Sequence, residues 1–201
     1  ALGVDGVLLI TPYYNKPSQE GLEAHYTKIA EATDVPIVLY NVPGRTGVNL
    51  LPETVADLSD IDGIVAVKEA SGNLDQVSKL LTLTNKITVL SGDDSLTLPM
   101  LAVGGKGVIS TASNVDPVRM SKLCQHWFAG KLEDARLMHS ELFELIRTMF
   151  IETNPMPVKA ALSMLGFIEN ELRLPLTPVK SDSIFPIEVA LREAALLEKH
   201  I

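Results

Sequence analysis

Short apolar runs recur through the first half of the chain, and each run is followed by polar loop residues and then by a helical pattern. Within the helical patterns, apolar residues return about every 3.6 positions, as in the stripe formed by Leu74, Val77 and Leu80. Each predicted helix therefore has one apolar side that can cover a sheet. The predicted strands lie at residues 7–10, 37–40, 64–68, 87–90 and 107–110.

The predicted strands are apolar throughout rather than alternating, which is typical of parallel strands that are buried on both faces. A closed barrel and an open doubly wound sheet both fit five strand-helix units. The barrel is favoured because polar residues follow successive strands, whereas no glycine-rich dinucleotide-binding motif follows any of them. We therefore predict an α/β fold, a TIM (β/α)8 barrel, of which the chain holds about the last five units.

The second half of the chain is predicted to be helical. A proline-containing stretch, Leu174 to Pro178, precedes the last helical pattern. These later helices indicate a C-terminal extension that packs against the barrel. The predicted helices cover residues 117–128, 132–151, 157–165 and 186–198.

Two parts are predicted from this change of pattern. Residues 1–115 form the C-terminal part of the (β/α)8 barrel, and residues 116–201 form the remaining barrel helix with a C-terminal helical region. The first residues, Ala1, Leu2 and Gly3, resemble the end of a glycine-capped helix. We therefore expect the first three units of the barrel to precede them.

Composition restricts the classes of partner. With 201 residues, 46% of them hydrophobic, the chain can bury one sizeable core. Its net charge of -8 argues against nucleic acid, because phosphate contacts need clustered Lys and Arg. Small molecules and other subunits are the expected partners. Neither a bilayer-length apolar stretch nor a signal-like N-terminus is found in the sequence, which predicts a cytoplasmic protein.

Cysteine and histidine contribute no predicted chemistry. The single cysteine, Cys124, lies in a helical pattern and cannot form an intrachain disulfide. The histidines lie in predicted helices without the spacing of metal ligands, so no metal site is predicted. They are His25, His126, His139 and His200.

Lys68 is the leading candidate for catalysis, because it ends an apolar run that reads as a buried strand. Burial removes water from the ammonium group and lowers its pKa, so that the neutral amine can attack a carbonyl carbon and form a Schiff base. The alternative is a lysine whose head reaches water or pairs with Glu69. Tyr40 ends the preceding strand at the same sheet edge, which favours the chemical interpretation.

Other strand ends carry further candidates, each with a structural alternative. Tyr13 and Tyr14 follow the first strand, where one could relay a proton or both could pack at a surface or subunit contact, and Ser18 is expected to cap the next helix. Arg45 lies in a Pro-Gly loop and could bind a carboxylate or form a surface ion pair. Asp93 and Asp94 follow the fourth strand, and at least one of them is interpreted as a helix-capping acid.

Six segments, in their order and spacing, resemble the dihydrodipicolinate synthase (4-hydroxy-tetrahydrodipicolinate synthase) family of pyruvate-dependent class I aldolases. The resemblance runs from Gly3 to Pro178 and implies a TIM barrel. It also implies the condensation of pyruvate with L-aspartate 4-semialdehyde in lysine and diaminopimelate biosynthesis, which is a lyase activity. The segments are TPYYNKPSQEG (11–21), YNVPGRTG (40–47), VKEASGN (67–73), LSGDD (90–94), GVIS (107–110) and NPMPVKAAL (154–162).

The resemblance also implies roles for single residues. Lys68 matches the Schiff-base lysine and Tyr40 the tyrosine that donates and accepts protons. Tyr14 matches a tyrosine that enters the proton relay of a neighbouring subunit. No cofactor is implied other than the covalent imine between Lys68 and pyruvate. Three further residues match substrate-binding positions: Arg45 for the semialdehyde carboxylate, and Ile109 and Gly92 for the pyruvate pocket.

Alternatives remain open at this point. A sister class I aldolase, such as N-acetylneuraminate lyase or a keto-deoxy sugar acid aldolase, shares the lysine and tyrosine, although Arg45 and the tyrosine pair favour the synthase. The threonine pair that holds the pyruvate carboxylate in the family is expected upstream of Ala1, so a non-catalytic truncated barrel fragment is the second alternative. The resemblance further implies a homotetramer built as a dimer of dimers, with Tyr14 exchanged across the dimer contact.

Overall fold

A computed structural model describes residues 3–198, and the chain divides into two compact units, Ala1–Ile109 and Ser110–Ile201. The division lies a few residues before the boundary predicted after residue 115, and that boundary stays a prediction. Two earlier interpretations fall outside the described residues: the helix end at Ala1 and Leu2, and the helical placement of His200. The two units are described separately below.

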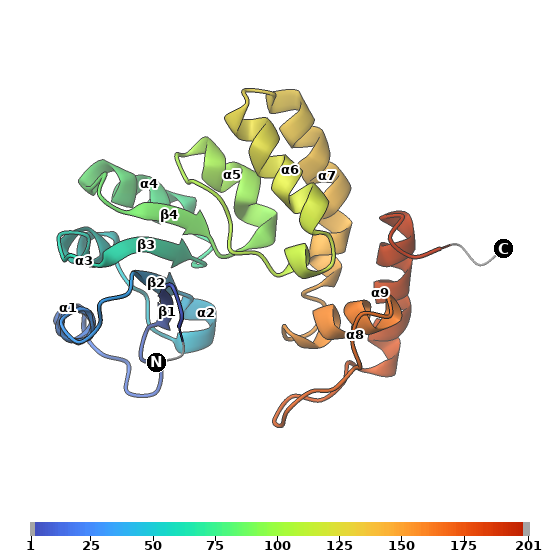
Figure 1. Cartoon of the computed structure of the whole chain (residues 1–201), viewed down its shortest axis with the longest axis horizontal. Coiled ribbons are helices and arrows are strands. Elements are labelled where there is room, and N and C mark those ends of the chain that lie inside the picture. The colour runs from blue at the N-terminus through green and yellow to red at the C-terminus, as the bar shows by residue number, and fades with distance from the viewer. Residues whose placement is uncertain (1–2, 199–201) are drawn as a thin grey trace. The chain divides into compact units, whose positions relative to one another are not determined.

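The first unit contains a parallel four-stranded sheet in the order β1-β2-β3-β4, with the helices following the strands as predicted (Figure 1). The strands are β1 (Val7–Ile10), β2 (Ile37–Asn41), β3 (Ile64–Glu69) and β4 (Thr88–Ser91). The helical elements are α1 (Gln19–Ala30), α2 (Pro43–Thr46), α3 (Pro52–Leu58), α4 (Leu74–Leu83), η1 (Asp94–Leu96) and α5 (Thr97–Ala102).

Local sequence explains where several of these helices begin. Ser18 caps α1 as predicted, since its side chain accepts a hydrogen bond from Gly21 N. Asn73 caps α4 in the same way by accepting from Gln76 N. Pro52 begins α3, where its missing N–H leaves no bond unmade. Short polar side chains and prolines therefore fix the turn from strand to helix.

The fifth predicted strand is wrong as a strand. Residues 107–110 form one isolated parallel bridge, in which Ser91 pairs with Val108. Ser91 N donates to Gly107 O at 2.8 Å and Ile109 N donates to Ser91 O at 2.8 Å, so the segment runs beside β4 for one pair only. Gly107 has a φ of +154°, a conformation that L side chains rarely adopt, which interrupts the extended backbone at this point.

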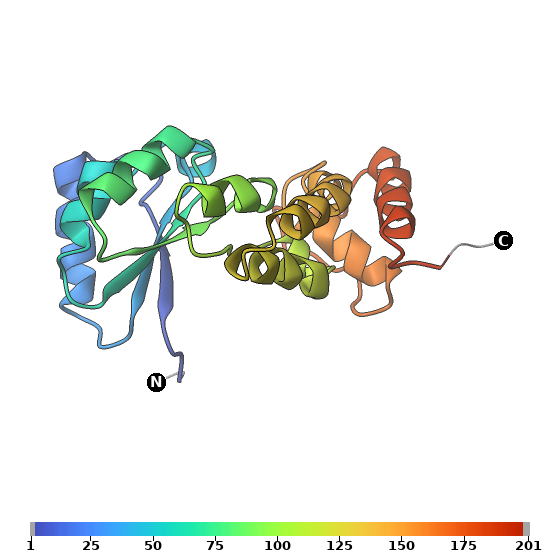
Figure 2. The same cartoon turned by 90° about the horizontal axis from the view of Figure 1, so that it is seen from above.

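The sheet is covered by helices on one face (Figures 1 and 2). One apolar cluster joins the strand residues Leu39 and Val67 to Leu22 of α1, Leu58 of α3 and Leu80 of α4. Because right-handed crossovers place successive helices on the same side of a curved sheet, all three helices pack against this face. The helix-covered face therefore holds the core of the first unit.

The opposite face of the sheet corrects a prediction. Strands that are apolar throughout were expected to be buried on both faces, but Leu8 is 45% and Ile10 39% exposed. None of the helices described in the first unit covers this face, and in a closed barrel such a face is covered by the other strands. Apolar side chains here therefore mark the barrel interior rather than a second helix layer.

The second unit is helical, as predicted. Its last helix differs from the prediction because it begins at Ser181 rather than near Pro186, which lies inside it. Burial of Ile187 and Leu191 stabilises this helix in spite of the internal proline. The elements are η2 (Ala112–Asn114), α6 (Pro117–Phe128), α7 (Leu132–Thr148), α8 (Met156–Met164) and α9 (Ser181–Glu193).

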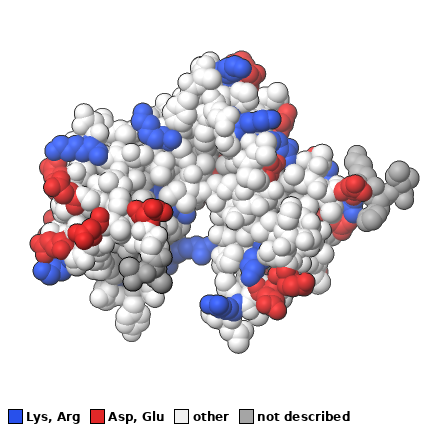
Figure 3. Space-filling view, in the orientation of Figure 1, with Lys and Arg blue, Asp and Glu red and all other residues white. Residues whose placement is uncertain are grey.

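Charged side chains of both signs are mixed on the surface in view in Figure 3. On the face in view in Figure 3, basic side chains are dispersed among acidic and uncharged ones rather than gathered in one patch. None of the helices described between residues 3 and 198 has both the length and the apolar character that crossing a bilayer requires.

Candidate active site

The candidate site lies at the carboxyl end of the sheet in the first unit, where the register places Lys68 of β3 beside Tyr40 of β2. The Lys68 Nζ lies 4.3 Å from the centroid of the Tyr40 ring. Both side chains are half-buried and lie on the sheet face that the helices do not cover. Structure and sequence therefore agree that an amine and a phenol meet at this edge.

Burial changes the proton affinity of both groups. Desolvation lowers the pKa of Lys68, the nearby charges of Asp94 and Asp93 raise it, and the charge of Arg45 lowers it further. For Tyr40, desolvation raises the pKa, which Arg45 lowers and Asp93 raises. The amine is thus biased toward its neutral form, and the phenol is biased toward keeping its proton.

The acidic pair after β4 differs in part from its predicted role. Asp93 stands at the N-cap position of η1, but its side chain makes no capping hydrogen bond. Desolvation and the charge of Asp94 raise the Asp93 pKa, and Lys68 lowers it. Asp93 therefore makes no capping bond and acts on Lys68 through its charge, whereas Asp94 lies in the first turn of η1, and a capping role for at least one of the pair stays a prediction.

Gly92 explains how the Lys68 side chain fits. A Cβ at this position would lie 2.6 Å from Ala70 Cβ and 3.1 Å from Lys68 Cε. The backbone also approaches closely, since Gly92 N donates to Glu69 O at 2.7 Å. Glycine is therefore required here mainly by Ala70 Cβ, and the Lys68 stem narrows the remaining space.

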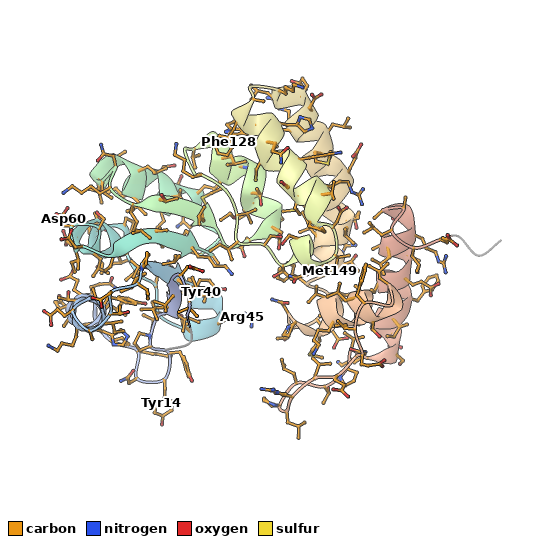
Figure 4. All side chains as sticks on the ribbon, viewed as in Figure 1. Tyr14, Tyr40, Arg45, Asp60, Phe128 and Met149 are labelled. Atoms are coloured by element: carbon orange, nitrogen blue, oxygen red, sulfur yellow. The ribbon has the colours of Figure 1, made fainter. Side chains whose placement is uncertain are left out.

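Of the other predicted site residues, two lie on adjoining parts of the first unit. Arg45 is exposed on α2, directly after the Tyr40 strand (Figure 4). Ile109 is half-buried and bonded through its N–H to Ser91, next to Gly92. These placements are compatible with substrate binding, and the roles of both residues stay predictions.

Tyr14 does not join the other candidates within the chain. It is 93% exposed and lies on the loop after β1, away from Tyr40 and Arg45 (Figure 4). Its neighbour Tyr13 is also exposed. Two exposed aromatic side chains in sequence are typical of a contact surface, so the role of Tyr14 depends on what this loop meets.

A second row of polar residues lies directly behind the candidate site, and sequence reasoning missed it. Each residue of this row comes directly after the last strand residue on the face that the helices do not cover, and each is buried. The row consists of Thr11, Asn41, Glu69 and Ser91. Consecutive residues of a strand point to opposite faces, so these side chains face the helices. The signal in the sequence was a polar residue in the same place at the end of four strands.

Glu69 is the centre of this row. Its contacts show that the predicted alternative, in which the Lys68 head pairs with Glu69, is wrong. Its carboxylate accepts from Asn41 Nδ2 at 3.0 Å, from Ser71 N at 2.6 Å and from Gln76 Nε2 at 3.3 Å. Desolvation raises the Glu69 pKa, and these hydrogen bonds lower it. Among the described residues no ion pair joins Lys68 to Glu69, because the two side chains leave β3 on opposite faces.

Metal and thiol chemistry find no support among residues 3–198. No group of three or more His, Cys, Asp and Glu side chains in that range is placed to hold a metal ion. Cys124 is half-buried on α6, and burial raises the pKa of its thiol, which leaves it poorly nucleophilic. The arrangement at Lys68 is instead suited to amine attack on a carbonyl group.

Comparison with known proteins shows which family this chain is similar to. The family model described as the dihydrodipicolinate synthetase family matches residues 1–194. A 4-hydroxy-tetrahydrodipicolinate synthase from Thermotoga neapolitana is 53% identical over 201 residues, which are 98% of this chain and 68% of that protein. The chain thus spans about two thirds of the length of this relative.

Solved structures agree with the sequence comparison. The dihydrodipicolinate synthase of Thermotoga maritima superposes with a TM-score of 0.95 at 51% identity, over 98% of this chain and 68% of that one. The chloride-inhibited enzyme of Acinetobacter baumannii, solved as a complex with pyruvate, gives a TM-score of 0.94 at 42% identity over the same shares. These structures are TIM barrels, so the predicted fold class is confirmed.

Proposed function

The chain belongs to the dihydrodipicolinate synthetase family, and on this premise we propose that it acts as a 4-hydroxy-tetrahydrodipicolinate synthase. The reaction is the condensation of pyruvate with L-aspartate 4-semialdehyde, a lyase reaction of the class I aldolase type in lysine and diaminopimelate biosynthesis. The observation that carries the proposal is the half-buried Lys68 amine lying 4.3 Å from the ring centroid of Tyr40.

In the proposed first step, neutral Lys68 Nζ attacks the keto carbon of pyruvate. The carbonyl oxygen takes up two protons and leaves as water, and a protonated imine joins Nζ to the substrate. One of these protons comes from the amine itself and Tyr40 donates the other, a role supported by the raised pKa that keeps its phenol protonated. No cofactor is needed for this step, because the lysine itself supplies the electron sink.

In the second step, the imine withdraws electrons and the pyruvate methyl group loses a proton, which gives an enamine. The enamine carbon then attacks the aldehyde carbon of the semialdehyde, whose oxygen takes up a proton as the new C–C bond forms. The amino group of the semialdehyde next attacks the imine carbon, which closes the ring and releases Lys68 as the free amine. Arg45 carries a guanidinium group suited to the semialdehyde carboxylate. Gly92 and Ile109 are the proposed lining of the pyruvate pocket, where backbone rather than side chains approaches the substrate.

Borohydride trapping tests the proposal directly. Incubation with pyruvate followed by reduction should convert the imine into a stable secondary amine, visible as one reduced pyruvate adduct by intact mass and located on Lys68 by peptide mapping. Lys68→Met should abolish the adduct. Lys106→Met, a substitution of an exposed lysine beside β4, should leave it unchanged. An adduct on another lysine, or none, would contradict the proposal.

Adduct formation tests the first alternative, and a comparison of substrates tests the second. A non-catalytic barrel fragment would form no adduct with pyruvate. A sister aldolase would form the adduct but would consume a sugar acid rather than condense pyruvate with the semialdehyde. The names of the relatives favour the synthase over the sister aldolase, and the adduct tests the fragment alternative.

We also propose a homotetramer built from tight dimers, in which Tyr14 enters the proton relay of the neighbouring subunit. The exposure of Tyr13 and Tyr14 on one loop supports a contact there. Sedimentation would measure the assembly, and Tyr14→Phe should slow turnover without lowering the thermal midpoint. An unchanged rate would remove Tyr14 from the relay. The cytoplasmic location stays a prediction.

A further inference from the structure

We propose that Glu69 is a positioning residue for the Schiff-base lysine: its buried carboxylate fastens the ends of β2 and β3 together behind the site, so that Lys68 and Tyr40 keep their mutual geometry. The inference rests on the function proposed above. It concerns a side chain that points away from the substrate and touches no reacting atom.

The register is the first observation. Tyr40 pairs with Lys68, and the following residues, Asn41 and Glu69, pair with each other. Because side chains alternate along a strand, one pair faces the uncovered side of the sheet and the other faces the helices. Any displacement of the Asn41–Glu69 pair therefore moves the Tyr40–Lys68 pair with it, since only one backbone unit separates them on each strand.

The hydrogen bonds are the second observation. Glu69 is 3% exposed, and the donors to its carboxylate are neutral: they are the amides of Asn41 and Gln76 and the backbone N–H and side chain of Ser71. A buried carboxylate that accepts bonds from the neighbouring strand, a loop and a helix is held from several directions.

Asn41 extends the same network to the segment between α2 and α3. Its Oδ1 accepts from Leu50 N at 2.9 Å, and its Nδ2 donates to Asn49 Oδ1 at 2.9 Å as well as to Glu69. Backbone bonds complete the attachment, since Ala70 N donates to Asn41 O at 2.8 Å. The carboxylate therefore ties together the loops that follow both chemical residues.

The role is one of geometry rather than of charge. The charges that act on the proton affinity of Lys68 are those of Asp94, Asp93 and Arg45. Replacing Glu69 should therefore change the rate of imine formation without moving the pH midpoint of that rate. A residue that acted by its charge would move the midpoint.

Glu69→Gln is the first test. Glutamine offers one acceptor oxygen and turns an NH2 group toward donors, so the network loses at least one bond. The rate constant of imine formation at saturating pyruvate should fall roughly ten- to a hundred-fold, with a smaller change in the pyruvate concentration that gives half the maximal rate. Val77→Ala, in the helix layer behind the sheet, is the control for loss of stability alone.

A reciprocal exchange provides the rescue. Asn41→Asp alone places two carboxylates within hydrogen-bond distance and should lower the imine rate further. In the double variant Asn41→Asp with Glu69→Gln, an amide again faces a carboxylate across the two strands, and the rate should recover at least several-fold relative to Asn41→Asp. Gln76→Met removes a single donor and serves as the milder test if Glu69→Gln does not fold.

The outcomes are separable. If the unsubstituted protein forms no adduct with pyruvate, the proposed function fails first. If it forms the adduct, and Glu69→Gln and Gln76→Met form it at the rate of Val77→Ala, the positioning role is wrong. A moved pH midpoint or an absent rescue would likewise overturn it, whereas a lowered rate with an unmoved midpoint and recovery in the double variant supports it.

Discussion

Two rows of side chains at the carboxyl end of the sheet differ in nearly every property, although each residue of one row adjoins a residue of the other in sequence. One row lies on the face that the helices do not cover, and its side chains are half-buried or exposed: Ile10, Tyr40, Lys68 and Leu90. Thr11, Asn41, Glu69 and Ser91 are buried against the helices.

The difference separates chemistry from support. Tyr40 and Lys68 keep access to a substrate, and their proton affinities are shifted by partial burial and nearby charge. Asn41 and Glu69 are 0% and 3% exposed, and their side chains form hydrogen bonds within the protein. Substitutions in the first row should therefore lower activity, and those in the second row should also lower stability.

The largest expected effect is in the first row. Tyr40→Phe removes the hydroxyl group and should lower kcat by about 10²- to 10⁴-fold, because general acid-base help is lost. The thermal midpoint should stay close to that of the unsubstituted protein. Tyr26→Phe, which removes the hydroxyl of a buried tyrosine on α1, is the control and should leave kcat unchanged. Equal rates for both variants would contradict the role of Tyr40.

Gly92 tests how closely the first row depends on space behind it. In Gly92→Ala the new methyl group would meet Ala70 Cβ at 2.6 Å and Lys68 Cε at 3.1 Å, so the lysine stem must move. A displacement of about 1 Å can cost on the order of 10²-fold in rate. Trapping kinetics with pyruvate would measure the loss. Gly44→Ala has nothing within 4 Å of its new methyl group and should behave like the unsubstituted protein.

A stability effect is expected from the second row. Asn41→Ala leaves the buried Leu50 N without its acceptor, at a cost of roughly 1–3 kcal/mol, and removes one of the donors to the Glu69 carboxylate. Urea unfolding would measure this loss. Gln125→Ala removes an exposed amide on α6 and should change the free energy of unfolding by less than about 0.5 kcal/mol. A similar small change for Asn41→Ala would show that the row is not supporting the fold.

The smallest expected effect is a shift in the pH dependence of imine formation, with opposite signs for two substitutions. Asp93 raises the Lys68 pKa, so Asp93→Asn should lower that pKa and extend imine formation to lower pH. Arg45 lowers the Lys68 pKa, so Arg45→Gln should raise it and shift the rise in rate to higher pH. The rate of trapping with pyruvate alone, followed across pH, measures both shifts. Shifts in the same direction would contradict this account of the charges.

Sequence reasoning predicted the elements of the first unit better than their surroundings. The four paired strands, the capping role of Ser18 and the meeting of Tyr40 with Lys68 were available from local pattern, since apolar runs, helix caps and strand ends are encoded over a few residues. The exposure of Leu8 and Ile10 could not be predicted from local pattern, because it depends on which face of the sheet the helices cover.

The sequence by itself determined the class of fold, the positions of the strand ends and the identity of the amine, because these depend on short apolar runs and on one lysine at the end of such a run. Only the tertiary structure decided the register between strands. That register places Asn41 beside Glu69. The tertiary structure also brings Gly92 close to the Lys68 stem, and it leaves Asp93 acting through its charge rather than through a capping bond. Contacts of this kind join residues far apart in the chain, so no local pattern contains them.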